Sequence, residues 1–198
     1  MSNKNKLFEI ADSQQGFFTA KQAVKCDYSR PNFHLNLASG EWTQEEERGI
    51  YRLARYPITD RPELVLWYIW SRNQKDIPQG VWSYETALDI HELSDVMSSK
   101  MHMTVPLNFR RRIEIPKVLC LYHENLKKSD IEVRQGYKVT SPIKTIIDVV
   151  NRGNIADNFI VQSVQQALER GLILKDELKN LKNSYLNIYK KLEGLLQW

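Results

Sequence analysis

The order of structural signals within residues 16–53 constrains the fold of this chain more than any other feature of its sequence. The segment has the pattern of a short helix, a tight turn, a second helix and a small hairpin that ends in ERGIYRL. A winged helix-turn-helix has this order, and it places its second helix in the major groove of DNA. We therefore expect residues 1–56 to form a DNA-binding domain.

The first half of this segment carries helix-start and turn signals. Gln22 follows Thr19 at the spacing of a capping box, so a helix should begin at Thr19. Asp27 occupies the turn, where its short polar side chain tolerates left-handed backbone better than most residues do. Apolar residues within 7–11 indicate an earlier helix that packs on the other two and completes a three-helix unit.

The second helix is expected over residues 29–39, because Ser29 can cap it, Pro31 suits its first turn and Gly40 suits its end. Its polar side carries residue types that read DNA, namely Arg30, Asn32, His34 and Asn36. Arginine donates two bonds to guanine, and asparagine pairs with adenine. A solvated helix face is the alternative for any single one of them, and only the whole pattern favours DNA binding.

Residues 42–53 have the pattern of a wing-like hairpin with a polar tip. We expect Arg48 and Arg52 to contact phosphates, which fix the register of a protein on DNA without reading its sequence. Three consecutive glutamates at 45–47 argue against a deeply inserted tip, because the DNA backbone repels them.

The charge balance limits how a single copy can bind DNA. The chain of 198 residues has a net charge of +4 and 42% apolar residues, which is ordinary for a globular protein. Within residues 1–56, however, 8 basic side chains are offset by 7 acidic ones. DNA affinity must therefore come from a local patch or from several copies that bind cooperatively.

Cysteine use and hydropathy indicate a cytoplasmic location. Cys26 and Cys120 are far apart and form no C-x-x-C motif, which is typical of reduced thiols. The N-terminus lacks the apolar core of a secretory signal, and no later run approaches the roughly 18 apolar residues of a membrane span. We expect no contact with a membrane.

After the first domain we expect a connecting helix and turn over residues 57–80 and a C-terminal domain over 81–198. The connecting helix contains Trp67, Tyr68 and Trp70, for which burial is the favoured interpretation and a stacking platform for bases is the alternative.

The C-terminal domain has the pattern of a small sheet and several helices. Strand-like runs lie at 102–106, 118–122, 131–134 and 137–140. Helices are expected after Ser83, after Ser141-Pro142, over 156–170 and over 174–196. The fold class is therefore α+β, an N-terminal winged helix-turn-helix followed by a mixed domain with a small sheet and C-terminal helices.

Signals for catalysis are weak. His91, His102 and His123 lack the ligand spacing of a metal site, and surface or structural roles are favoured for them. Glu114 and Lys117 superficially resemble a nuclease pair, but Pro116 interrupts the strand that would align them. We expect no catalytic residue, no metal and no cofactor.

A run of three arginines, Arg110, Arg111 and Arg112, is the densest cationic cluster of the chain. A solvated loop and a contact with nucleic acid or a protein partner are two interpretations that the sequence leaves open.

Several segments together resemble the AbiEi family of type IV antitoxins over roughly residues 5–175. The segments are GFFTAKQA at 16–23, ERGIYRL at 47–53, WSYETALDIHELSDV at 82–96, HMTVP at 102–106 and GYKVTSPIKTIIDVV at 136–150. Each is weak alone, but their order and spacing are fairly specific.

The resemblance implies a non-enzymatic antitoxin of an abortive infection (phage defence) system. Such a protein binds inverted repeats in the promoter of its own operon and represses it. It also counters a nucleotidyltransferase-like toxin without forming a stable complex, and its C-terminal domain is needed for this. The expected DNA-contacting residues are Lys21, Ser29, Arg30, Asn32, His34, Asn36, Arg48 and Arg52. A stand-alone winged-helix regulator with a ligand- or partner-sensing C-terminal domain is the alternative.

Overall fold

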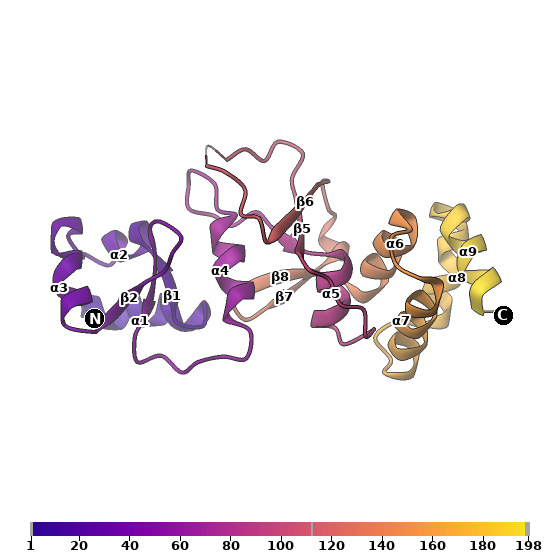
Figure 1. Ribbon diagram of the computed structural model, residues 1–198, viewed down its shortest axis with the longest axis horizontal. Helices are drawn as coiled ribbons and strands as arrows, with labels where there is room; N and C mark the ends of the chain where they lie inside the picture. Colours follow the sequence, from indigo (N-terminus) through magenta and orange to yellow (C-terminus); the bar gives the residue numbers. More distant parts are fainter. Residues whose placement is uncertain (1, 112, 197–198) are drawn as a thin grey trace. The chain divides into compact units, whose positions relative to one another are not determined.

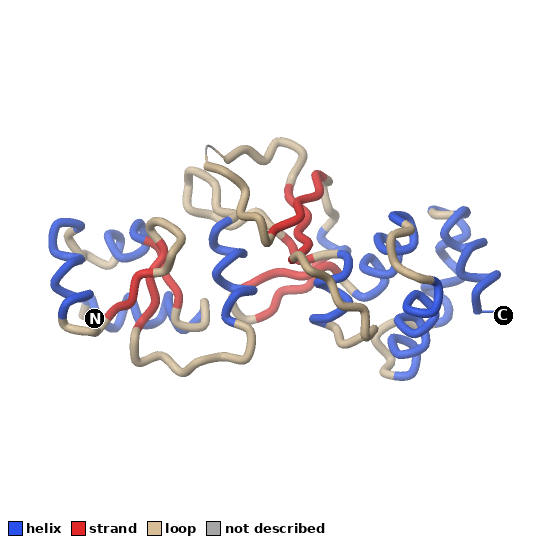
Figure 2. Tube along the Cα trace, in the orientation of Figure 1, coloured by secondary structure: helices blue, strands red, loops and turns tan. Residues whose placement is uncertain are grey.

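The computed structural model describes residues 2–111 and 113–196 (Figure 1). The chain divides into two compact units. The first unit is Met1–Gly80 with Val133–Tyr137, and the second is Val81–Glu132 with Lys138–Trp198. Helices and strands occur in both, so the predicted α+β class is confirmed (Figure 2).

The first unit builds a three-stranded antiparallel sheet with strand order β1-β3-β2. Its elements in chain order are α1 (Asn3–Ser13), β1 (Phe17–Thr19), α2 (Ala20–Lys25), the 3-10 turn η1 (Arg30–Asn32), α3 (Phe33–Ala38), β2 (Trp42–Gln44), β3 (Ile50–Leu53) and α4 (Pro62–Trp70). The predicted earlier helix, turn and hairpin are therefore confirmed as elements.

The start of α2 follows from two reciprocal hydrogen bonds. The Thr19 hydroxyl accepts from the Gln22 amide at 3.1 Å, and the Gln22 side chain accepts from the Thr19 amide at 2.8 Å. This is the predicted capping box. Asp27 has φ of 67°, so the turn uses left-handed backbone as the residue type allows.

The second helix is shorter than predicted. A 3-10 turn covers residues 30–32, and the α-helix begins only at Phe33, because Asn32 with φ of −94° and ψ of 1° lies outside the α region. Ser29 stands at the N-cap position, but its side chain makes no capping bond, so the predicted cap is wrong.

Aromatic packing on Trp42 holds α3 against the sheet. The Trp42 side chain is buried, and its ring centroid lies 4.9 Å from Phe18, 5.2 Å from Phe33 and 6.0 Å from Tyr51. Most of these contacts are tilted or edge-to-face, the geometries that aromatic quadrupoles favour. Because Phe33 is the first residue of α3, its burial determines which side of the helix faces outward.

The aromatic residues of the connecting helix α4 are buried or half-buried, as the favoured interpretation predicts. Trp70 is fully buried, and Trp67 and Tyr68 are half-buried. Burial raises the pKa of the Tyr68 hydroxyl, which agrees with an apolar environment.

The second unit contains most of a five-stranded sheet of order β6-β5-β4-β8-β7 and five α-helices among the described residues. The elements that follow Gly80 are β4 (Val81–Trp82), α5 (Tyr84–Ile90), β5 (Met101–Val105), β6 (Leu119–His123), η2 (Lys128–Asp130), β7 (Ile131–Arg134), β8 (Tyr137–Thr140), α6 (Pro142–Arg152), α7 (Asp157–Glu169), α8 (Lys175–Ser184) and α9 (Leu186–Leu196). Of these, the end of β7 and the start of β8 belong to the first unit. The four predicted strands are confirmed, whereas the two-residue β4 is an addition.

Helix α6 runs through the core of this unit. The Ser141 hydroxyl accepts from the Lys144 amide, Pro142 is the first helical residue, and Gly153 ends the helix in left-handed backbone. The predicted start is therefore confirmed. Residues 144–150 of α6 are all buried.

The single helix predicted over 174–196 is wrong. It is broken at Tyr185, which has φ of −141° and ψ of 56°. One straight helix would hold Leu178 and Leu192 about 21 Å apart along its axis. Because α9 folds back on α8, both leucines enter the same buried cluster.

We expect Gly16→Ala to destabilise the first unit by about 2 kcal/mol more than Gly40→Ala. Both glycines have positive φ, so the backbone conformation disfavours alanine at both positions. A Cβ at Gly16 would lie 2.6–2.8 Å from Tyr56 side-chain atoms, whereas nothing lies within 4 Å of one at Gly40. Urea denaturation of the full chain measures the difference, and equal losses for the two variants would contradict this packing.

Candidate functional sites

The outward side of η1 and α3 presents a row of polar side chains. Ser29, Arg30, Asn32 and His34 are exposed, and Asn36 is half-buried. Four of the five predicted residues of the segment 29–36 are therefore open to a partner, and Asn36 is partly covered.

His34 has a defined tautomer on this face. Its Nδ1 lies 2.6 Å from the Pro31 carbonyl oxygen, which can only accept, so Nδ1 carries the proton. Nε2 is then the ring nitrogen that can accept a hydrogen bond from a partner. Leu35 adds an apolar contact point here, since its side chain is 57% exposed.

The predicted basic contacts differ in how available they are. Lys21 is exposed, but its ammonium donates to the Gln74 carbonyl at 2.5 Å. Arg52 is half-buried, donates to the Pro57 carbonyl at 2.8 Å and lies over the Phe17 ring at 5.6 Å. Arg48 is exposed on the β2–β3 hairpin. Arg48 is therefore better placed for an outside partner than Arg52.

A residue that sequence reasoning missed fixes this hairpin. The guanidinium of Arg72 donates to the Arg48 carbonyl at 3.3 Å and pairs with Asp76 at 3.2 Å. Asp76 in turn accepts from the Thr19 hydroxyl at 2.5 Å. These bonds tie the loop between β2 and β3 to the start of α2, and no local sequence motif indicates them.

The arginine run lies in the second unit, on the loop between β5 and β6. Arg110 is exposed and donates to the Phe109 carbonyl at 2.8 Å, and Arg111 is half-buried. Arg112 lies outside the described residues.

A polar cluster lies in the second unit, and we name it the buried polar cluster after its buried members Glu85 and His102; its half-buried members are Tyr84, Tyr122 and Arg152. Arg152 Nη1 donates to the two Glu85 oxygens at 3.2 and 3.0 Å and lies 3.2 Å from His102 Nδ1. The guanidinium also lies over the Tyr84 and Tyr122 rings, at 5.5 and 5.0 Å. One cation is thus shared by a carboxylate, an imidazole and two aromatic faces.

The groups around His102 favour one proton position on its ring. His102 Nδ1 lies 3.2 Å from the Arg152 donor, 2.9 Å from the Tyr122 hydroxyl and 3.5 Å from Glu85 Oε2, and the nearer arginine donor favours Nδ1 as an acceptor. The proton therefore lies on Nε2, which donates to the Ser98 hydroxyl at 2.9 Å. Burial lowers the pKa of His102, which keeps the ring neutral. In this tautomer His102 cannot accept a proton from Ser98, although Ser98, His102 and Glu85 superficially resemble a hydrolase triad.

A second set of charges lies on α6. The Lys144 ammonium donates to Asp148 at 2.7 Å and to Glu124 at 2.8 Å. Asp148 Oδ2 is buried and has no hydrogen-bond partner, and burial raises the pKa of Asp148 to about 6. Nearby Tyr84 has φ of 52°, and burial raises its pKa to about 12. Left-handed backbone at a tyrosine is strained, and such strain is concentrated at functional sites.

Two of the segments singled out in the sequence supply members of the buried polar cluster. Tyr84 and Glu85 come from 82–96, and His102 comes from 102–106. No sequence pattern indicated this cluster. For the neighbouring charges on α6, the available signal was the pair Lys144 and Asp148, spaced i,i+4 on an otherwise apolar helix face.

No protein-family model and no curated protein matches the chain. Among solved structures, the RV2827C protein from Mycobacterium tuberculosis is similar, with a TM-score of 0.58 and 10% sequence identity. The match covers 98% of this chain and 76% of that chain. At this identity the likeness shows a shared fold alone.

Within residues 2–111 and 113–196, none of the helices combines the length and apolar character needed to cross a bilayer. Likewise, no group of three or more histidine, cysteine or acidic side chains in these ranges is arranged to hold a metal ion.

We expect Asp148→Asn to change how stability depends on pH. The folded pKa of about 6 lies above the unfolded value, so the wild type loses stability as pH rises from about 4 to about 6. The variant has no carboxylate to ionise at this position, so this pH-dependent loss of stability is absent from it. Its stability relative to wild type should therefore increase by up to about 3 kcal/mol between pH 4 and 7.

Urea denaturation at several pH values measures this change. Asp176→Asn, at an exposed aspartate of α8, is the matched control for removal of a carboxylate. A constant difference for Asp148→Asn, or one that falls as pH rises, would contradict the burial of an ionisable Asp148.

Proposed function

We propose that this protein is a DNA-binding autorepressor and a non-enzymatic antitoxin of a type IV abortive infection system. The observation that carries the DNA-binding half is the exposed polar face of 29–36, on a unit with the order α1-β1-α2-α3-β2-β3. That element order and the sheet order β1-β3-β2 support a winged helix-turn-helix whose wing is the β2–β3 hairpin. The proposed partner is double-stranded DNA that carries inverted repeats of the promoter. The proposed location is the cytoplasm.

The residues of this face have separate roles in the proposal. Arg30 donates to guanine and Asn32 pairs with adenine, while the Nε2 of His34 accepts from a base amino group. Leu35 contacts a thymine methyl group, for which apolar side chains are suited. Arg48 contacts phosphate at the edge of the site.

The charge balance of residues 1–56 determines how copies of the protein bind DNA in this proposal. The near balance of basic and acidic residues in 1–56 limits the affinity of one copy. Inverted repeats compensate, because several copies then bind neighbouring sites cooperatively. The acidic tip at 45–47 stays away from the DNA backbone in this binding mode. Glu45 and Glu47 are half-buried, and Glu46 is exposed.

The antitoxin half of the proposal rests on the second unit. The resemblance assigns it the action against a nucleotidyltransferase-like toxin without a stable complex. Two of the resembling segments supply Tyr84, Glu85 and His102 of the buried polar cluster, which supports this role, since a strained Tyr84 and the Glu85–Arg152 pair contribute little to stability. No bound cofactor is required.

The same strained cluster also favours a second candidate, a stand-alone regulator whose second unit senses a ligand or partner. The two functions differ in the neighbouring gene. A nucleotidyltransferase next to this gene favours the antitoxin, and its absence favours the stand-alone regulator.

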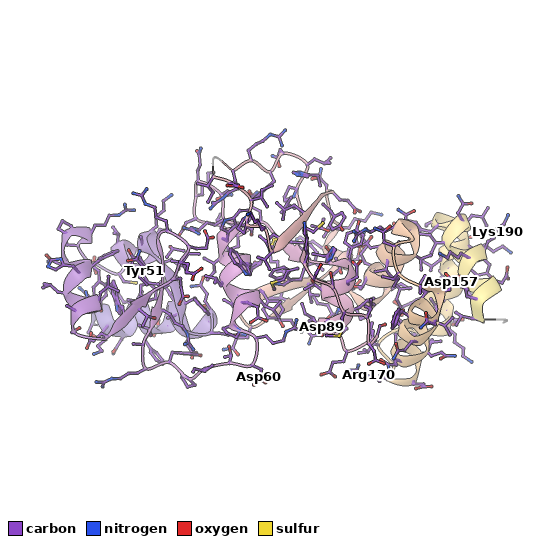
Figure 3. The ribbon with its side chains drawn as sticks, in the orientation of Figure 1. Tyr51, Asp60, Asp89, Asp157, Arg170 and Lys190 are labelled. Carbon is purple, nitrogen blue, oxygen red and sulfur yellow. The ribbon has the colours of Figure 1, made fainter. Side chains whose placement is uncertain are left out.

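Gel shifts with the upstream region of the operon test the DNA contacts. Arg30→Ala and Asn32→Ala should each cost about 1–3 kcal/mol and relax base preference, whereas Arg48→Ala should weaken all sequences alike and reduce the salt dependence. Lys190→Ala on α9, an exposed lysine of the second unit (Figure 3), is the control. Equal affinity for the promoter and for scrambled DNA at matched salt would contradict specific repression.

Growth rescue tests the antitoxin role. With both proteins expressed from unrelated promoters, Tyr122→Phe should reduce protection from the toxin because it removes the hydroxyl bond to His102 Nδ1. Arg30→Ala should protect fully, since it affects only DNA. Circular dichroism confirms that both variants fold. Full protection by Tyr122→Phe and by Glu85→Gln would exclude the buried polar cluster from the antitoxin activity.

A further inference from the structure

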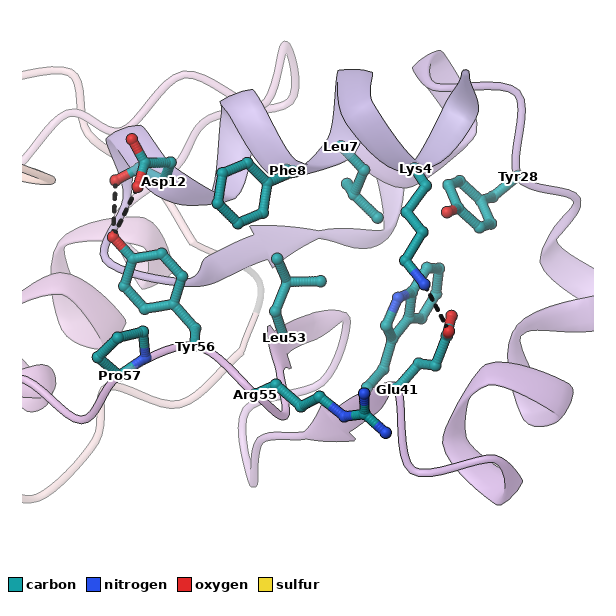
Figure 4. Close-up of a pocket in the computed structure, with 11 residues that line it drawn as sticks. Lys4, Leu7, Phe8, Asp12, Tyr28, Glu41, Leu53, Arg55, Tyr56 and Pro57 are labelled. Carbon is teal, nitrogen blue, oxygen red and sulfur yellow. Dashed lines mark hydrogen bonds and ion pairs between the residues drawn. The ribbon is translucent and has the colours of Figure 1, made fainter.

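A pocket of about 370 Å³ lies within the first unit, between α1 and the strand ends of the hairpin (Figure 4). None of the eight residues proposed to contact DNA lines it. Its lining residues are Lys4, Leu7, Phe8, Asp12, Tyr28, Glu41, Trp42, Leu53, Arg55, Tyr56 and Pro57. The volume falls within the roughly 300–1,000 Å³ of small-molecule sites.

The walls of the pocket suit a flat apolar ligand. The Phe8 and Tyr56 rings line the half of the pocket nearer Asp12, with ring centroids 6.5 Å apart. Leu7 and Leu53 line its centre (Figure 4). Phe8 is 51% exposed although it is large and apolar, so an uncovered aromatic face is available there. Burying such a face against a ligand ring removes apolar surface from water.

The charges of the pocket are unequal at its two ends. At one end the Asp12 carboxylate accepts from the Tyr56 hydroxyl at 2.9 Å. At the other end the Lys4 ammonium pairs with Glu41 at 2.7 Å. The pKa of Glu41 is lowered by its bond to Lys4 and also by the charge of Arg55. Two cations thus share one carboxylate, which leaves one positive charge in excess at this end.

We propose that this pocket binds a small aromatic carboxylic acid. The ring lies against Phe8 and Tyr56, and the carboxylate is held by Arg55 and Lys4 beside Glu41. A guanidinium holds a carboxylate through two parallel hydrogen bonds, which a neutral group cannot reproduce.

Occupancy of the pocket is coupled to the proposed reading helix through Trp42. Trp42 lines the pocket, and its ring packs on Phe33, the first residue of α3. Tyr28, a second lining residue, also packs on Trp42 at 4.9 Å. A ligand that shifts Trp42 therefore changes the position of α3 and the affinity for DNA. This regulatory part rests on the proposed function, whereas ligand binding itself does not.

Nuclear magnetic resonance of the ¹⁵N-labelled full chain tests ligand binding without DNA. The probes are 2-naphthoate and its neutral analogue 2-naphthamide. We expect both to shift the Trp42 indole signal, with 2-naphthoate binding about tenfold more tightly. Arg55→Gln should remove this difference, and Phe8→Ser should weaken both probes. Lys75→Gln, at an exposed lysine outside the pocket, should leave both affinities unchanged.

Each outcome decides one part of the proposal. Equal affinities of the two probes in the wild type, or no binding of either at millimolar concentration, would overturn the carboxylate site. If 2-naphthoate binds but leaves the promoter affinity in a gel shift unchanged, the regulatory part is overturned. A wild type that binds 2-naphthoate but not its promoter contradicts the proposed function and leaves the ligand site in place.

Discussion

The packing of the Trp42 ring is the interaction on which the first unit depends. Trp42 begins β2 and contacts Phe18 of β1, Phe33 of α3 and Tyr51 of β3, so a single side chain joins three strands and a helix. Since the Phe33 side chain is held inward, the residues on the opposite side of the helix face solvent. The polar face of 29–36 is therefore a consequence of aromatic burial, and the pocket beside Trp42 lies next to the same contact.

The second unit has a different organising constraint, which is buried charge. Glu85 and Arg152 form one ion pair, and Lys144 with Asp148 forms another, inside a unit whose core is otherwise apolar. Desolvation of such pairs costs about as much as their attraction returns, so stability alone does not explain them. The orphaned Asp148 Oδ2 and the left-handed Tyr84 add further cost. This concentration of unfavourable features is what supports a functional role for the buried polar cluster.

Local signals in the sequence were sufficient for much of the fold. The capping box of Thr19, the left-handed turn at Asp27 and the Ser141-Pro142 helix start each depend on residues within a few positions, and all three are confirmed. The four predicted strands of the second unit are also confirmed, because turn residues bound them.

Features set by distant contacts could not be predicted in this way. The break at Tyr185 follows from packing α8 and α9 into one core, and no glycine or proline marks it. The Arg52 bond to Pro57 and the Arg72 bond to Arg48 depend on the folded backbone. Glu85 and Arg152 are 67 positions apart, so their pairing is invisible to any local pattern.

The account depends most on the claim that residues 29–36 read DNA. The most direct measurement is a titration of the ¹⁵N-labelled full chain with a duplex that carries the inverted repeats of its promoter. We predict that the largest amide shifts lie within 29–36 and at Arg48, and that a scrambled duplex perturbs them far less. Shifts concentrated on the loop between β5 and β6, or an absence of shifts within 29–36, would contradict the account.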